Sequence, residues 1–178
     1  MLSMSISARH EPMDPVLKES PSHEVNLAVR WVSIMSKLAP PSDRQQGSHA
    51  LLPTLLCRNL VVDLLHSQPG HLFFTLKVTS GIANRYETLH GGAIGSLVEI
   101  LGCAAIISIT GSSTGSVSDI NISYISGTPV KEELDLEAHV LKVGNKIAVA
   151  SVDIRHKVSG KVAAQGRVTM YLNVDSKL

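Results

Sequence analysis

Aromatic side chains are scarce in this 178-residue chain, where phenylalanine, tyrosine and tryptophan together make up 3% of the residues. Single-stranded nucleic acids are bound largely by stacking of their bases on aromatic rings, so the composition argues against such a partner. The formal net charge is only +1 at pH 7, whereas a domain that binds DNA or RNA needs a basic surface. The sequence therefore predicts no nucleic-acid partner.

Cysteine and metal-ligand clusters are also lacking. Cys57 and Cys103 stand alone in apolar segments, which predicts reduced core thiols rather than disulfides. The eight histidines show no metal-ligand spacing, so we expect no metal site. Two of them, His139 and His156, fall in predicted strands and are expected at exposed positions.

The first 27 residues show no sustained periodicity and are predicted to be a mobile tail, residues 1–27. A single folded domain is expected from residue 28 to residue 175, since an apolar fraction of 44% can build a core. Apolar residues at helical spacing predict a helix from Val25 to Leu38, which Pro40 and Pro41 end.

Strand patterns occupy most of the remaining chain. Two apolar runs, 60–65 and 72–78, predict a β-hairpin. Four segments with period-two alternation between residues 119 and 170 predict four strands in an antiparallel meander. With the long apolar helix between these two groups, we expect an α+β fold in which a six-stranded antiparallel sheet wraps around a long central helix, preceded by an N-terminal helix.

The predicted central helix runs from Gly91 to Thr110, with Gly111 as its C-cap. Its apolar run is short for a bilayer and contains Glu99, so we expect a buried core helix and no membrane insertion. Glu99 is the one residue in this helix that is charged at neutral pH. Because carboxylates are seldom buried unless they are paired or functional, Glu99 is a candidate catalytic residue.

The start of this helix is the second candidate site. Gly91 and Gly92 follow His90, and glycines leave the free N–H groups of a helix start open to an anion or a developing oxyanion.

An ordered set of motifs carries a family resemblance from about Leu60 to Leu172. It consists of Asn84, His90-Gly91-Gly92, Glu99 nine residues after the histidine, and the run Ser-Asp-Ile-Asn-Ile-Ser-Tyr at 118–124. The set resembles the hotdog-fold acyl-CoA thioesterases of the PaaI-like group, and most of all their acyl-CoA thioesterase 13 type. The resemblance implies a hotdog thioesterase domain that hydrolyses medium- to long-chain fatty acyl-CoA to free acid and CoA without a metal or organic cofactor.

The resemblance also implies catalytic roles by position. Asn84 and the N–H of Gly91 would hold and polarise the thioester carbonyl. His90 would orient the Asn84 region or the substrate. Glu99 would activate water as general base or attack the carbonyl as nucleophile.

One position departs from the family. Relatives place a serine that helps to orient the water where this chain has Val117. The side chains of Ser116 and Ser118 are expected on the opposite face of the strand, so neither replaces it without a bulge.

Relatives bind CoA along the end of the first meander strand and along the following hairpin. The corresponding residues are Tyr124, Ser126, Gly127 and Thr128, then Lys142, Gly144, Asn145 and Lys146. Lys142 and Lys146 flank a glycine turn and would meet phosphates as point charges.

Helix geometry predicts that two chains build each site. Nine residues separate His90 from Glu99, about 13 Å at 1.5 Å per residue, which is beyond hydrogen-bond reach. An antiparallel second copy of the helix would bring Glu99 of one subunit to Gly91 of the other. We therefore expect a homodimer, or a homotetramer as a dimer of dimers.

Three other functions remain open at this stage. One is a thioesterase for an aromatic substrate such as 1,4-dihydroxy-2-naphthoyl-CoA, which peroxisomal relatives of the fold hydrolyse. The second is a non-catalytic hotdog module that binds acyl-CoA. The third is a dehydratase, but the motifs at Asn84 and His90 favour a thioesterase.

The last three residues, Ser176-Lys177-Leu178, match the C-terminal tripeptide that the peroxisomal import receptor reads, which predicts a peroxisomal location.

We expect a fluorescently tagged protein with its C-terminus free to enter peroxisomes, and a variant with one residue appended after Leu178 to stay in the cytosol, because the receptor reads a terminal tripeptide. Fluorescence microscopy of the pair checks this. Continued import of the extended variant would refute the address.

Overall fold

The computed structural model describes residues 22–35, 51–111 and 115–172. Six strands form one antiparallel sheet in the order β1-β2-β4-β5-β6-β3. Their bounds are Leu60–Gln68 for β1, His71–Lys77 for β2, Gly115–Tyr124 for β3, Glu133–Val143 for β4, Ile147–His156 for β5 and Val162–Leu172 for β6. The helices are α1 (His23–Met35), α2 (Leu51–Asn59) and α3 (Gly91–Thr110), with a 3-10 turn at Ser80–Ile82. Ser176-Lys177-Leu178 lies outside the described residues.

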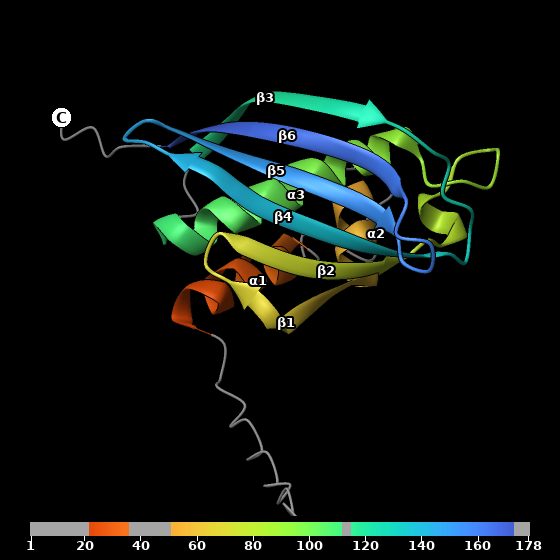
Figure 1. The fold of residues 1–178 in the computed structure, drawn as a ribbon, viewed down its shortest axis with the longest axis horizontal. Coiled ribbons are helices and arrows are strands. Elements are labelled where there is room, and N and C mark those ends of the chain that lie inside the picture. The colour runs from red at the N-terminus through yellow and green to blue at the C-terminus, as the bar shows by residue number, and fades with distance from the viewer. Residues whose placement is uncertain (1–21, 36–50, 112–114, 173–178) are drawn as a thin grey trace, which may run out of the picture.

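The predicted α+β fold is confirmed. The sheet curves around α3, and α1 and α2 pack against α3 as well (Figure 1). The argument from helix length was wrong, because α3 is long and apolar enough to cross a membrane, with a mean hydropathy of 2.0. Burial decides the matter, since 72% of its most apolar window lies inside the fold. The helix is thus the core of the domain.

The predicted meander of four strands is wrong in one connection. Of these four strands, only β4, β5 and β6 follow one another in the sheet, whereas β3 pairs with β6 at the far edge. The segment 125–132 therefore crosses from β3 to β4, which lies beside β2. It is held along the way by hydrogen bonds from the Leu89 N–H to the Thr128 oxygen (2.9 Å) and from the Lys131 N–H to the Val78 oxygen (2.8 Å). Period-two alternation identifies a strand but not its partner.

The N-terminal helix begins earlier than expected. It starts at His23, where the Ser22 hydroxyl accepts a hydrogen bond from the Val25 N–H at 3.3 Å. Residues 23 and 24, which the sequence pattern placed only in the tail, are thus helical, and Val25 is buried. The expected end of this helix at Leu38 lies outside the described residues, and α2 had no sequence prediction.

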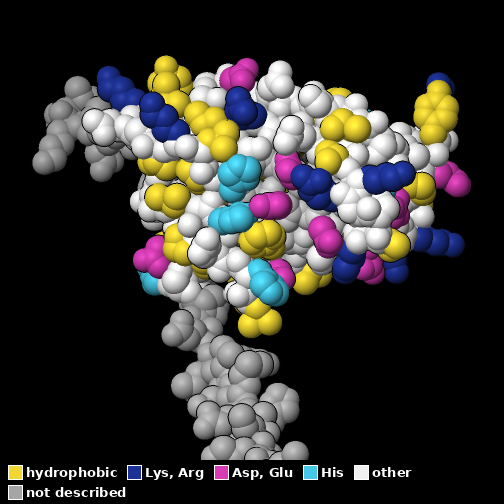
Figure 2. Space-filling view, viewed as in Figure 1, with side chains coloured by type: hydrophobic (Ala, Val, Ile, Leu, Met, Phe, Trp, Pro, Cys, Tyr) yellow, Lys and Arg dark blue, Asp and Glu magenta, His cyan; other side chains and the backbone are white. Residues whose placement is uncertain are grey.

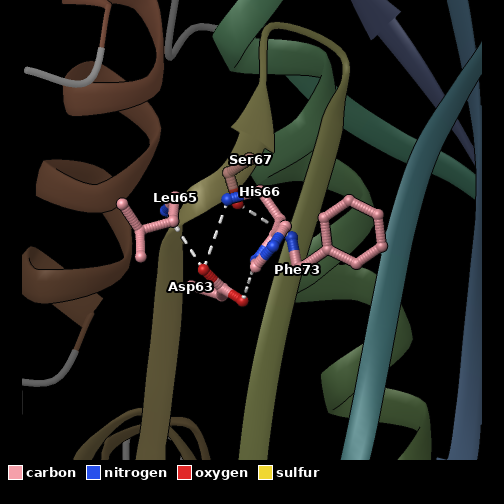
Figure 3. A network of polar contacts seen from close by, with 5 residues as sticks. All are labelled: Asp63, Leu65, His66, Ser67 and Phe73. Atoms are coloured by element: carbon pink, nitrogen blue, oxygen red, sulfur yellow. Dashed lines mark hydrogen bonds and ion pairs between the residues drawn. The ribbon is translucent and has the colours of Figure 1, made fainter. Parts of the chain in front are cut away.

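Strand β1 is longer than its apolar run because polar side chains support an irregular stretch (Figure 3). The register with β2 shifts between Asp63 and Gln68. Within this stretch one carboxylate oxygen of Asp63 accepts from the N–H groups of Leu65 (3.1 Å) and His66 (3.3 Å), and the other lies 2.7 Å from the His66 ring. The Ser67 hydroxyl accepts from the Phe73 N–H at 3.0 Å. Side chains thus replace backbone partners where the ladder is interrupted.

Two glycines allow α3 to lie directly on the sheet. A Cβ at Gly102 of α3 would overlap Val168 of β6. A Cβ at Gly166 of β6 would lie 2.5 Å from the Val98 Cγ2 and 3.1 Å from its Cβ. The small size of Gly102 thus permits the close approach of the helix to the sheet.

Replacement of Gly166 with alanine is expected to lower the free energy of unfolding by about 1–3 kcal/mol, because the new methyl group meets the Cβ of Val98 and no rotamer change relieves that contact. Urea denaturation followed by circular dichroism measures the loss. Gly81→Ala is the matched control, since nothing lies within 4 Å of a Cβ there. Equal stability of the two variants would contradict the close packing of α3.

Candidate active site

His90 is the N-cap of α3. Its backbone is extended (φ −64°, ψ 135°), and its ring Nδ1 accepts a hydrogen bond from the Gly92 N–H at 2.9 Å. Its own N–H donates to the Ile82 oxygen at 3.0 Å. Because Nδ1 is an acceptor, the neutral ring carries its proton on Nε2. The histidine thus begins the helix, and its exposed ring offers one further donor.

The N–H of Gly91 remains open. Within the described part of the chain it has no hydrogen-bond partner. The Tyr124 ring lies beside it, 3.6 Å from where a Cβ would stand, and the Tyr124 hydroxyl donates to the Gly91 oxygen at 3.2 Å. A free donor at the start of a 20-residue helix can stabilise negative charge on a carbonyl oxygen.

Asn84 organises the loop that leads into α3. Its side-chain oxygen accepts from the N–H groups of Tyr86 (2.8 Å) and Thr88 (3.3 Å), and its amide nitrogen donates to the Thr88 hydroxyl at 2.9 Å. Its backbone N–H donates to the Thr88 oxygen at 2.8 Å. The side chain thus holds its own loop, and its predicted role toward the thioester carbonyl stays a prediction.

Glu99 is exposed, unlike the embedded carboxylate that the sequence suggested. The sheet does not cover α3 all round. Gly92 and Glu99 are exposed and Ser96 is half-buried, at helical spacing on one face. Among the described residues, no hydrogen bond or ion pair engages Glu99. Burial of the Cys103 thiol raises its pKa to about 12, and the charge of Glu99 is the second and smaller cause.

Strand β3 contains the bulge that the sequence argument required. The β3–β6 register shifts between Val117 and Asp119, so Ser118 is the extra residue. Its exposed hydroxyl donates to the Thr169 oxygen at 3.2 Å. Val117 packs with the cluster that contains Cys103. The hydroxyl that the bulge presents is thus hydrogen-bonded to the backbone of β6.

The two parts of the predicted CoA site lie at opposite ends of the sheet (Figure 1). The first part follows Tyr124, which pairs with Ala164 on β6, whereas Ile147, at the second part, aligns with Tyr171 of β6. Seven residues of β6 separate the two levels, roughly 23 Å at 3.3 Å per residue. Both groups as a CoA site stay a prediction, with this separation between them in one chain. Lys142, Asn145 and Lys146 are exposed and Gly144 is half-buried in the distant hairpin.

At the end of the sheet near the start of α3, the predicted CoA-binding residues differ in how accessible they are to a ligand. Gly127 packs against Thr88, with 3.5 Å between its Cβ position and the Thr88 methyl group. Thr128 is only 1% exposed, so it is shielded from a ligand that approaches through solvent. Ser126 is exposed, but its hydroxyl contacts the ring of His156 at 2.8 Å.

His156 is not among the site residues that the sequence predicted. Its side chain is 12% exposed, so the expectation of an exposed strand position was wrong. Its Nδ1 lies 2.6 Å from a carboxylate oxygen of Glu132, and its Nε2 contacts Ser126. Separations of 24 and 30 residues along the chain give no motif that could have revealed the set.

A second histidine cluster lies on the outer face of the sheet, where Figure 2 shows histidine side chains next to an acidic one. The His71 Nε2 on β2 is 2.6 Å from a Glu137 oxygen on β4, and the ring of His139 is 5.9 Å from that of His71. The buried Nδ1 of His139 has no partner among the described residues. These side chains border a cavity of about 460 Å³.

Comparisons with known proteins agree on one family. The model of the thioesterase superfamily matches residues 86–163. Acyl-coenzyme A thioesterase 13 of Mus musculus is 38% identical over 111 residues, which are 62% of this chain and 79% of that protein. A putative esterase of Caenorhabditis elegans is 34% identical over 171 residues, 96% of this chain and 90% of its own length. The crystal structure of zebra fish thioesterase superfamily member 2 superposes with a TM-score of 0.69 at 29% identity, over 85% of this chain and 99% of that one.

Replacement of His90 with alanine is expected to cost about 1 kcal/mol of stability, because the Gly92 N–H loses its side-chain acceptor. His90→Asn is the matched variant, since its side-chain oxygen can cap the helix in place of the ring, and we expect it to keep most of that stability. Urea denaturation of the three proteins checks this. Equal losses in both variants would contradict the capping role.

Proposed function

Because the chain belongs to the thioesterase superfamily, we propose that it hydrolyses the thioester bond of medium- to long-chain fatty acyl-CoA to give a free acid and CoA. Thioester hydrolysis is the activity of the family, and the coenzyme A ester follows from the name of the relative in Mus musculus. The fatty chain is our further proposal, carried over from the resemblance of the sequence motifs.

The observation that carries this proposal is the pair of unused groups on α3. The Gly91 N–H is an open donor at the helix start, and Glu99 is an exposed carboxylate without a partner among the described residues. In the proposed reaction the Gly91 N–H donates to the thioester oxygen and stabilises the charge that develops there. Glu99 accepts a proton from the attacking water. The Tyr124 ring and the Nε2–H of His90 border the carbonyl.

The spacing of these two groups supports a composite site. Eight residues of helix separate Gly91 from Glu99, about 12 Å at 1.5 Å per residue, which no hydrogen bond spans. We propose that α3 of a second copy lies antiparallel along the face with Gly92, Ser96 and Glu99, so that each subunit completes the other's site. The small residues on this face leave room for such an approach. The assembly is a homodimer or a dimer of dimers.

The proposed location and the competing function both come from the sequence alone. A peroxisomal location remains a prediction of residues 176–178. A non-catalytic module that binds acyl-CoA is the competing function, and it predicts that Glu99 is dispensable for the slow turnover that such a module would show.

Glu99→Gln is expected to lower kcat roughly 10²–10⁴-fold, because the amide cannot accept the proton of water, while acyl-CoA still binds. Release of free CoA measures turnover, and calorimetry with a non-hydrolysable acyl-CoA thioether measures binding. Gly91→Pro removes the N–H without breaking the helix, since proline is well accepted at the first helical position. Gly91→Ala keeps the N–H and is its control, because a Cβ there meets Tyr124 at 3.6 Å, an ordinary contact.

Co-expression of Glu99→Gln with Gly91→Pro tests the composite site. If each site uses both chains, random pairing leaves about a quarter of the sites with an intact Gly91 and an intact Glu99, and turnover returns to about that fraction. No recovery would show that each chain carries its own site. Equal turnover of wild type and Glu99→Gln would favour the binding module.

A further inference from the structure

Three side chains at one end of the sheet form a relay that has no catalytic role in the proposed thioesterase reaction. The Ser126 hydroxyl lies 2.8 Å from the Nε2 of His156, and the His156 Nδ1 lies 2.6 Å from a carboxylate oxygen of Glu132. Ser126 and Glu132 belong to the crossing segment between β3 and β4, whereas His156 is the last residue of β5. The order hydroxyl, imidazole, carboxylate is that of a nucleophilic triad.

The carboxylate fixes how the relay is protonated. An ionised carboxylate only accepts hydrogen bonds, so the Nδ1 of His156 carries a proton. In the neutral ring Nε2 is then an acceptor, and the Ser126 hydroxyl donates to it. The Val162 oxygen, 3.2 Å from the same hydroxyl, is the acceptor that remains when the ring is cationic and its Nε2–H donates to Ser126. Glu132 thus selects the tautomer in which His156 can remove a proton from Ser126.

The three groups differ in how far they are exposed to solvent. Ser126 is exposed, while the His156 and Glu132 side chains are 12% and 26% exposed. An accessible hydroxyl can reach a substrate, and a shielded contact between an imidazole and a carboxylate is screened less by solvent. The neighbouring Lys157 does not compete for Glu132, because it pairs with Glu133 at 2.9 Å.

The backbone holds the nucleophile in place. The N–H groups of Ile125 and Ser126 both donate to the Ala163 oxygen, at 2.9 and 3.0 Å, and the His156 N–H donates to the Lys161 oxygen at 2.9 Å. A reactive group needs such support if it is to keep its geometry.

We propose that Ser126 is a second nucleophile, with His156 as its general base and Glu132 as the residue that positions His156, and that it accepts acyl groups from small activated carboxylic esters and thioesters. The Ser126 Oγ forms a bond to the carbonyl carbon as its proton passes to the His156 Nε2. The bond to the leaving alkoxide or thiolate breaks, and His156 returns the proton to that group. Water then cleaves the acyl-serine by the same steps in reverse.

A fluorophosphonate probe tests the nucleophile directly, since the Ser126 Oγ forms a bond to phosphorus as the P–F bond breaks and fluoride leaves. We expect one equivalent of label on the full-length protein, mapped to Ser126 by mass spectrometry and lost in Ser126→Ala. His156→Gln and Glu132→Gln should slow the labelling, the first by roughly 100-fold or more. Thermal melting of each variant shows that it is folded.

Two control variants make the outcome specific. Ser118→Ala should label like wild type, because Ser118 is an exposed serine whose hydroxyl contacts only a backbone oxygen. Glu99→Gln should also label like wild type, which separates this proposal from the thioesterase mechanism. Labelling of wild type that is no faster at Ser126 than at Ser118, or a Ser126 rate that His156→Gln leaves unchanged, would overturn the proposal.

Discussion

The contact between α3 and the sheet is the constraint on which the rest of this structure depends. Gly102 meets Val168, and Val98 meets Gly166, so that in each pair one partner has no side chain. Backbone and valine therefore touch at two places on strand β6. This close approach, together with the packing of α1 and α2 on the helix, buries most of the apolar 20-residue α3. It also fixes the direction in which the remaining face of the helix points.

That remaining face carries the chemistry. Because the sheet covers only part of α3, Glu99 is exposed while its neighbours Val98 and Ile100 are buried. The open N–H of Gly91 lies two turns away on the same rigid helix. A rigid helix cannot fold back to bring the two together, so the geometry of one element argues for a second chain in the proposed reaction.

The crossing segment 125–132 has two consequences. By connecting β3 to β4 across the end of the sheet, it places the Thr128 oxygen on the loop that leads into α3. The same path brings Ser126 and Glu132 to opposite sides of the His156 ring. The end of the sheet near the start of α3 thus gathers both the open helix terminus and a shielded histidine relay.

The sequence by itself determined the strands, the central helix and its caps, because each depends on local pattern. Period-two alternation gave the strands, and the glycine at 111 ends α3 with φ of 66° as its type predicts. The motif His90-Gly91-Gly92 correctly marked the helix start. These features depend on neighbours in the chain.

Only the tertiary structure decided which strands pair, which face of α3 stays open and which distant residues meet. Alternation cannot choose between β4 and β6 as the partner of β3, since both offer a matching face. The exposure of Glu99 depends on where the sheet ends rather than on its own apolar surroundings. Ser126, Glu132 and His156 meet because a crossing segment passes the end of β5, and no local pattern encodes a contact between residues so far apart in the chain.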